Sequence, residues 1–314
     1  MFGLILGAII LVAGILLMTI SSDKAVEHSI IIASALGVSP LIIGFTLVSI
    51  GTDLPEIVNS ILSCALGHGN IDAGDSIGSV LTQLTLIFGI LPFFGASFKV
   101  KRREILATGS CLILALMLVV SIVEKGYISR INALFLVGSW PIYMLITKTI
   151  ISRGARKAPD FVQITKNKRS RHIVIAVLGF VGVAVGAYAV IQSIIMLSAS
   201  FKIPEYVISF FLLAIGTSLP ELAVDLTALR KRQYKIVIGD IVGSCVVDAS
   251  LSIGIGQVFF PQAVSGELAS ITTLYTMFAS LAVIFTLAVR EKVDKKAGII
   301  LIMLYLFSYT LLII

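Results

Sequence analysis

The segments GTDLPE (Gly51–Glu56) and GTSLPE (Gly216–Glu221) are near copies of each other, 165 residues apart in the chain (216 − 51). Each lies within a long apolar stretch and is followed, at the same offset, by a second matching element, GDSIGS (Gly74–Ser79) or GDIVGS (Gly239–Ser244). A carboxylate at the centre of a membrane costs about 2.5–3.5 kcal/mol on insertion scales. Two glutamates in duplicated helices that proline interrupts are best explained by a cation that neutralises them.

The composition identifies an all-α integral membrane protein. Hydrophobic residues make up 58% of the chain and charged residues 13%, whereas soluble domains carry about 25% charged residues. The apolar runs have the length of helices that cross a bilayer, about 20 residues, and they lack the short alternating pattern of barrel strands. The odd number of cysteines, all in apolar surroundings, argues against a disulfide framework.

The apolar segments predict ten transmembrane helices, the first of them a retained helix rather than a signal peptide. The expected spans are about 2–20, 27–66 (an approach segment and a broken helix), 71–96, 105–123, 131–149, 172–198, 204–229, 236–260, 268–289 and 297–314. With the N-terminus outside, 21 of the 24 Lys and Arg residues fall in inside connections. This bias follows the positive-inside rule and places both termini outside.

The polar stretch 150–171 divides the chain into a first five-helix repeat, residues 1–149, and a second, residues 172–314. The stretch is expected to be a cytoplasmic basic linker whose charge serves topology. Binding of anionic lipid or of a regulator is the alternative, and nothing else indicates nucleic-acid binding. Because five is odd, the second repeat starts on the opposite side of the membrane. The two halves are therefore expected to have inverted topologies, a common plan of secondary transporters.

Both motifs supply hard oxygen ligands near the middle of the membrane. Pro55 and Pro220 cannot donate to the carbonyls of Gly51 and Gly216, so each helix is expected to break there. Pairs of oxygen-bearing residues recur four positions apart, which places each pair on one helix face: Thr52 with Glu56, Thr217 with Glu221, Ser79 with Gln83, and Ser244 with Asp248. Thiolate and imidazole are missing from this set, which favours Ca²⁺ or Na⁺, with Mg²⁺ or Mn²⁺ as alternatives.

Two further aspartates, Asp75 and Asp240, lie near the expected starts of helices. The simpler interpretation is that each is an N-cap that accepts hydrogen bonds from backbone donors. A role in an ion funnel is the alternative.

The paired motifs resemble the two alpha-repeats of the cation/calcium exchanger superfamily, and the prokaryotic sodium/calcium exchangers most of all. The resemblance covers the whole chain and implies four central helices that enclose the cation sites, with the two glutamates on Ca²⁺ and flanking oxygens on Na⁺. Carried over by motif, the implied metal ligands of the first repeat are Ser49 (backbone carbonyl), Thr52, Asp53, Glu56, Ser79 and Gln83. Those of the second repeat are Ala214 (backbone carbonyl), Thr217, Ser218, Glu221, Ser244 and Asp248.

Three positions depart from the family pattern. Gln83 stands where Asn is expected, and Ser49 where a small apolar residue is common. Asp53 stands where the sodium/calcium branch has Ser and adds a fourth carboxylate. Four close carboxylates cannot all be ionised without compensating charge, so one site is expected to bind H⁺ in place of Na⁺ or to hold a cation more tightly.

The sequence thus predicts a secondary antiporter, not an enzyme, that exchanges Ca²⁺ for Na⁺ by alternating access. It is expected to be a multi-pass protein of the prokaryotic plasma membrane, a monomer without cofactor, whose partners are Ca²⁺, Na⁺ and lipid. An H⁺-coupled antiporter for Ca²⁺ or another divalent cation is the alternative. The proton-coupled branch typically carries Asn where this chain has Thr52 and Thr217, which favours Na⁺. An ion channel is less consistent with an inverted repeat in one chain, and a hydrolase lacks an activated nucleophile.

Overall fold

The computed structural model describes residues 2–35, 49–95, 97–151, 169–230, 232 and 234–312. This part of the chain is helical, with short loops and four two-residue strands. The elements of the first half are α1 (Phe2–Ala35), α3 (Ser49–Thr52), α4 (Leu54–Ala65), α5 (Gly69–Leu81), a π-helical segment (Thr82–Ile87), α6 (Phe88–Phe94), β1 (Phe98–Lys99), α7 (Arg102–Val123), β2 (Tyr127–Ile128) and α8 (Arg130–Ile151).

From the helix break onward, the second half follows the order of the first, and before the break its described residues add α10 and a π-helical segment. It contains α9 (Arg169–Phe201), α10 (Glu205–Ile208), a π-helical segment (Ser209–Leu213), α11 (Ala214–Thr217), α12 (Leu219–Arg230), α13 (Tyr234–Val247), a further π-helical segment (Asp248–Ser252), α14 (Ile253–Phe259), β3 (Gln262–Ala263), α15 (Gly266–Arg290), β4 (Lys292–Val293) and α16 (Lys295–Leu312). Most of the predicted linker, residues 152–168, lies outside the described residues.

Seven helices of the described residues are long and apolar enough to cross a membrane, and two shorter apolar helices accompany them. The fold is therefore an all-helical membrane fold, while the number of ten spans stays a prediction. One expected boundary is wrong: the first helix does not end near residue 20 but continues to Ala35. Within its polar stretch, Lys24 pairs with Glu27 at 2.9 Å on the exposed face, and the Ser22 hydroxyl donates to the Gly51 carbonyl.

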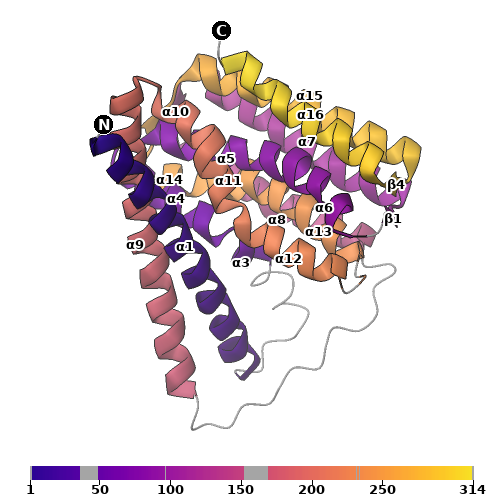
Figure 1. Ribbon diagram of the computed structural model, residues 1–314, viewed down its shortest axis with the longest axis horizontal. Coiled ribbons are helices and arrows are strands. Elements are labelled where there is room, and N and C mark those ends of the chain that lie inside the picture. Colours follow the sequence, from indigo (N-terminus) through magenta and orange to yellow (C-terminus); the bar gives the residue numbers. More distant parts are fainter. Residues whose placement is uncertain are drawn as a thin grey trace.

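The helices that carry the elements GDSIGS (Gly74–Ser79) and GDIVGS (Gly239–Ser244) lie at the centre of the bundle. In the continuous helices Gly69–Phe94 and Val237–Phe259, 78% of the residues in an apolar 18-residue stretch are buried, against 28% in Leu4–Ser29. Helices α1 and α9 lie side by side along one flank, and α7, α15 and α16 lie together on another (Figure 1). Gly14 and Gly186 face each other where α1 and α9 meet, and their lack of side chains permits this close approach.

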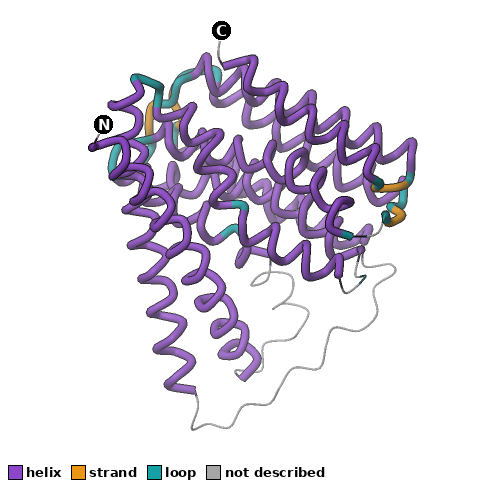
Figure 2. Tube along the Cα trace, in the orientation of Figure 1, coloured by secondary structure: helices purple, strands orange, loops and turns teal. Residues whose placement is uncertain are grey.

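The four short strands give the relative direction of the two halves. β1 pairs with β4, and β2 pairs with β3. The two pairs lie at opposite ends of the helices (Figure 2). At the offset of the motifs, β1 corresponds to β3 and β2 to β4, to within one residue. Corresponding strands thus lie at opposite ends, so these parts of the two halves run in opposite directions across the bundle.

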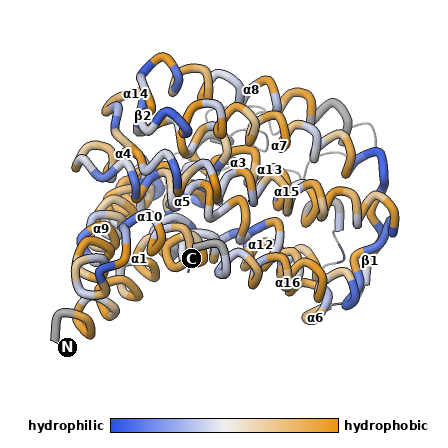
Figure 3. Tube along the Cα trace, turned by 90° about the horizontal axis from the view of Figure 1, so that it is seen from above, coloured by the Kyte–Doolittle hydropathy of each residue, from blue (hydrophilic) through white to orange (hydrophobic). Residues whose placement is uncertain are grey.

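The end of the bundle with β1 and β4 is rich in positive charge, and we refer to it as the basic end. Its residues include Lys99, Lys101, Arg102, Arg103, Arg290, Lys292, Lys295 and Lys296. Figure 3 shows hydrophilic residues beside β1, and also beside β2 at the other end, whereas the helices between them are mainly apolar.

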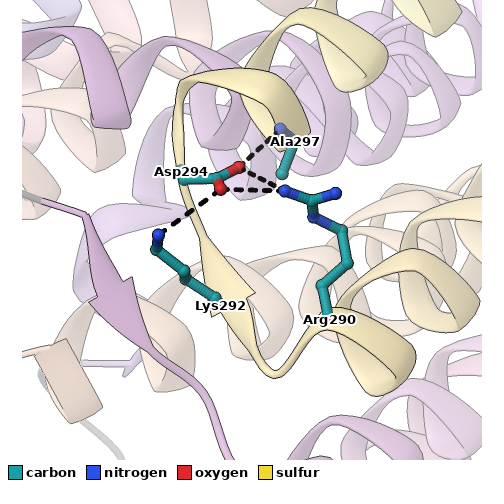
Figure 4. A network of polar contacts seen from close by, with 4 residues as sticks. All are labelled: Arg290, Lys292, Asp294 and Ala297. Carbon is teal, nitrogen blue, oxygen red and sulfur yellow. Dashed lines mark hydrogen bonds and ion pairs between the residues drawn. The ribbon is translucent and has the colours of Figure 1, made fainter.

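Asp294 stabilises the turn at this basic end (Figure 4). It accepts a hydrogen bond from the backbone N–H of Ala297 at 2.9 Å and two from Arg290 at 2.9 and 2.8 Å, and Lys292 lies at 3.6 Å. The N–H of Ala297, followed by the Arg290 side chain and the charges of Arg290 and Lys292, lowers the pKa of the Asp294 carboxyl.

Replacement of this carboxylate is expected to destabilise the protein in a pH-dependent way. Asp294→Ala removes a helix cap, which costs about 0.5–2 kcal/mol. Because the folded pKa of Asp294 lies below its unfolded value of about 3.9, the carboxylate stabilises above that pH and the effect is lost as the pH falls through the folded pKa. Thermal unfolding in detergent should separate the variant from the wild type at pH 7, and the difference should shrink as the pH is lowered through the folded pKa of Asp294. A difference that does not change with pH would contradict this role.

Candidate cation site

Each motif interrupts its helix at the residue before the Leu-Pro-Glu sequence. Asp53 lies between α3 and α4 with φ −80° and ψ 10°, and its counterpart Ser218 lies between α11 and α12 with φ −82° and ψ 9°. Both fall in the sparsely allowed bridge region. Pro55 occupies the first turn of α4, where a backbone N–H has no helical partner to lose. The two halves thus repeat the break with nearly identical backbone geometry.

Two carbonyl groups near the breaks, at positions that are not equivalent in the repeat, accept hydrogen bonds. The Gly51 carbonyl accepts a hydrogen bond from the Ser22 hydroxyl of α1 at 3.2 Å. The Ala214 carbonyl accepts one from the N–H of Ser218 at 3.3 Å, and its second lone pair stays available. Ser49 is the first residue of α3, and only its backbone is described. The sequence did not identify Ser22, because it was placed in a connection between helices.

Glu56 and Glu221 follow the breaks and carry two of the unpaired charges of the site. Each is 1% exposed, and within the described part of the chain none of their four carboxylate oxygens accepts a hydrogen bond. Glu56 interacts electrostatically with Glu221, Asp248, Asp75 and Asp53, so the carboxylates repel one another. An ionised carboxylate inside a protein is costly unless it is paired or binds a metal. The negative charge of the site is therefore not balanced by a positive group of the protein among the described residues.

Asp53 and Asp248 extend this negative cluster. Both are fully buried, and neither oxygen of Asp53 has a hydrogen-bond partner among the described residues. Asp53 interacts electrostatically with Asp248, and the hydroxyl of Ser244 lies beside it. One oxygen of Asp248 accepts from the Gln83 amide at 3.1 Å, and the other has no partner.

Several polar contacts among the described residues join the two halves at this level. The Ser79 and Thr217 hydroxyls lie 3.4 Å apart, and the Gln83 amide lies 3.4 Å from the Ser218 hydroxyl as well as 3.1 Å from Asp248. Gln83 and Asp248 occupy equivalent positions in the two π-helical segments of the central helices. Such segments are frequent at functional sites because they re-aim side chains.

The structure thus brings most of the predicted site residues into one buried region. The Thr52 hydroxyl belongs to it as a buried atom that has no hydrogen-bond partner. No group of three or more His, Cys, Asp or Glu side chains of the described residues is arranged to hold a metal on its own. Any ion bound here would therefore also need hydroxyl, amide and carbonyl oxygens.

The N-cap interpretation of Asp75 and Asp240 is wrong. α5 begins at Gly69 and α13 at Tyr234, so both aspartates lie inside helices. Asp75 accepts hydrogen bonds from the Asn59 amide at 2.7 Å and the Thr217 hydroxyl at 3.0 Å. It therefore positions Thr217 from the other half of the chain. Sequence reasoning missed Asn59, which lies three residues after Glu56 and therefore on the same side of the helix. Its amide is the donor that could have indicated a partner for Asp75.

The family model of the sodium/calcium exchanger protein matches residues 6–148 and 171–314. The chain belongs to this family. It is 27% identical to the inner membrane protein YrbG of Escherichia coli, over 82% of this chain and 81% of that protein. It is 29% identical to the sodium/calcium exchanger MaX1 of Methanosarcina acetivorans, over 43% of this chain and 39% of that protein.

Among solved structures, the sodium-calcium exchanger NCX_Mj is similar along its whole length. Its structure soaked with Na⁺ and Sr²⁺ has a TM-score of 0.62 and 26% identity to this chain, covering 98% of this chain and 99% of that one. The predicted resemblance to prokaryotic sodium/calcium exchangers is therefore confirmed. The family and these relatives make the chain a membrane antiporter, and the relatives with a named function are transporters rather than enzymes.

A cation that binds the two glutamates should stabilise the folded protein. Ligand binding contributes about 2.7 kcal/mol at a concentration 100 times Kd, so Ca²⁺ should raise the unfolding temperature of the purified chain. Glu56→Gln removes one of the two glutamate charges and should abolish most of this increase. Glu267→Gln, the same chemical change at an exposed position of α15, is the matched control and should retain it. Equal increases in both variants would exclude Glu56 as a ligand.

Proposed function

We propose that this chain exchanges Ca²⁺ for Na⁺ across the membrane by alternating access at the buried carboxylate site. One observation supports this function above all others: Glu56 and Glu221 come from equivalent broken helices, are 1% exposed, and have no hydrogen-bond donor among the described residues. A cation of either kind would neutralise this cluster. Only the neutralised site could then be closed off from water, and this requirement couples the movement of the two ions.

The chemistry of the proposed ligands indicates which of them bind Ca²⁺ and which bind Na⁺. Ca²⁺ accepts six to eight oxygen ligands in flexible geometry, and Glu56 with Glu221 supplies its negative charge. The remaining ligands are proposed to share the Na⁺ ions or complete the Ca²⁺ shell: Ser49, Thr52, Asp53, Ser79, Gln83, Ala214, Thr217, Ser218, Ser244 and Asp248. Overlap between the two sets makes the ions compete for one site.

The inverted arrangement of the two halves is compatible with the movement that alternating access requires. In transporters of this plan, one group of helices moves against another around a site near the midplane. We infer that residues 1–149 and 172–314 are the two repeats, that both termini face outside, and that the basic end faces the cytoplasm under the positive-inside rule. One relative of this chain is named the sodium/calcium exchanger MaX1, which supports Na⁺ as the coupled ion.

Asp53 favours one alternative, the coupling of Ca²⁺ to H⁺. The second half has Ser218 at this position, so Asp53 adds a negative charge that the repeat does not require. Up to four carboxylates then share the site, and a single Ca²⁺ compensates only two of them. The remaining charge is to be met by Na⁺ or by protons, and the two possibilities predict different driving ions.

Transport into proteoliposomes distinguishes them. Vesicles loaded with Na⁺ and diluted into Na⁺-free buffer should take up ⁴⁵Ca²⁺, and a matched arm replaces the Na⁺ gradient with a pH gradient. Glu56→Gln should lose uptake in both arms and Glu267→Gln should retain it. Uptake that depends on internal Na⁺ supports the proposal. Uptake driven only by the pH gradient would contradict Na⁺ coupling, and its loss in Asp53→Ser would make Asp53 the proton carrier.

A further inference from the structure

A second pair of buried carboxylates lies outside the cation site described above. Asp225 on α12 is 0% exposed, and neither of its oxygens has a hydrogen-bond partner among the described residues. Asp240 on α13 is half-buried, and one of its oxygens is also buried without a partner. The two carboxylates are close enough to interact electrostatically. The ion pairs found among the described residues include neither of them.

The pair lies between the central site and the basic end. Asp225 comes four residues after Glu221, and Asp240 comes four residues before Ser244, so each is one helical turn from a residue of the central site. Beyond the pair, α12 approaches the basic end where Leu229 packs against Gly95. α13 begins there as well, with Tyr234 stacked on Phe98 of β1 at a centroid distance of 5.0 Å.

The first half of the chain provides an internal comparison. Asp75, the counterpart of Asp240, is satisfied by Asn59 and Thr217. The position equivalent to Asn59 is occupied by Val224, which cannot donate.

The position equivalent to Asp225 is occupied by Ser60, whose hydroxyl accepts a hydrogen bond from the Gly256 N–H at 3.1 Å. In the second half, therefore, a donor has been lost and a negative charge added at the same place. A purely structural role would not require this combination.

We propose that Asp225 and Asp240 form a second cation site that takes a hard divalent cation, with Ca²⁺ as the first candidate. The two carboxylates offer up to four oxygens, and water completes the shell that Ca²⁺ prefers. Asp240 also interacts electrostatically with Asp53 and Glu221, which links the pair to the central site. The pair therefore holds a cation between the central site and the basic end, a role that goes beyond exchange at the central site.

Equilibrium binding of ⁴⁵Ca²⁺ to the full chain in lipid nanodiscs tests this site directly. The double variant Glu56→Gln/Glu221→Gln removes the central charges and should keep a residual Ca²⁺ equivalent. Adding Asp225→Asn should abolish this residual binding, whereas Asp225→Glu should preserve it. Asp72→Asn is the matched control: Asp72 is a fully buried carboxylate elsewhere, held by Gln257 at 2.8 Å and Cys64 at 3.3 Å, and its loss should leave residual binding unchanged.

Two outcomes would overturn the proposal: the absence of residual Ca²⁺ binding in the double variant, or its persistence after Asp225→Asn. If Asp225→Asn does not fold, Asp225→Ser introduces the side chain that the first half carries at this position and gives the same readout. Failure of Ca²⁺ transport by the wild type would contradict the proposed exchange alone, because Asp225-dependent binding is measured without transport.

Discussion

The structure depends on one physical constraint, the burial of carboxylates that the protein itself does not satisfy. Glu56, Glu221 and Asp53 lie fully inside the helical core with no hydrogen bond among the described residues. A buried charge of this kind costs several kcal/mol unless an opposite charge arrives. The broken helices and the π-helical segments place oxygen-bearing side chains in this buried region.

The two repeats share the backbone geometry of the helix break, but they carry different side chains at equivalent positions. The backbone at Asp53 and Ser218 is almost the same, yet one side chain is charged and the other is neutral. Gln83 and Asp248 are equivalent as well, and they bond to each other at 3.1 Å across the interface. An approximately symmetric scaffold thus holds an asymmetric set of oxygen-bearing side chains, and the proposed competition of unlike cations rests on this asymmetry.

Sequence reasoning found the parts that repetition and hydropathy encode. The paired motifs predicted the helix breaks, and the strand pairs agree with halves that run in opposite directions. It failed where tertiary contacts override local rules. Ser22 and Lys24 look like a connection but belong to a continuous helix. Asp75 resembles a cap but lies within α5, because Asn59 and Thr217 satisfy it from other elements. Partners that are distant in sequence cannot be read from spacing.

The most direct test of the central claim is anomalous diffraction from crystals of this chain soaked with Sr²⁺, a heavier substitute for Ca²⁺. The account predicts an anomalous peak within coordination distance of both Glu56 and Glu221, and its loss in Glu56→Gln crystals. Data of the same quality without a peak there, and with both glutamates hydrogen-bonded to protein groups, would contradict the claim that a cation neutralises the buried carboxylates.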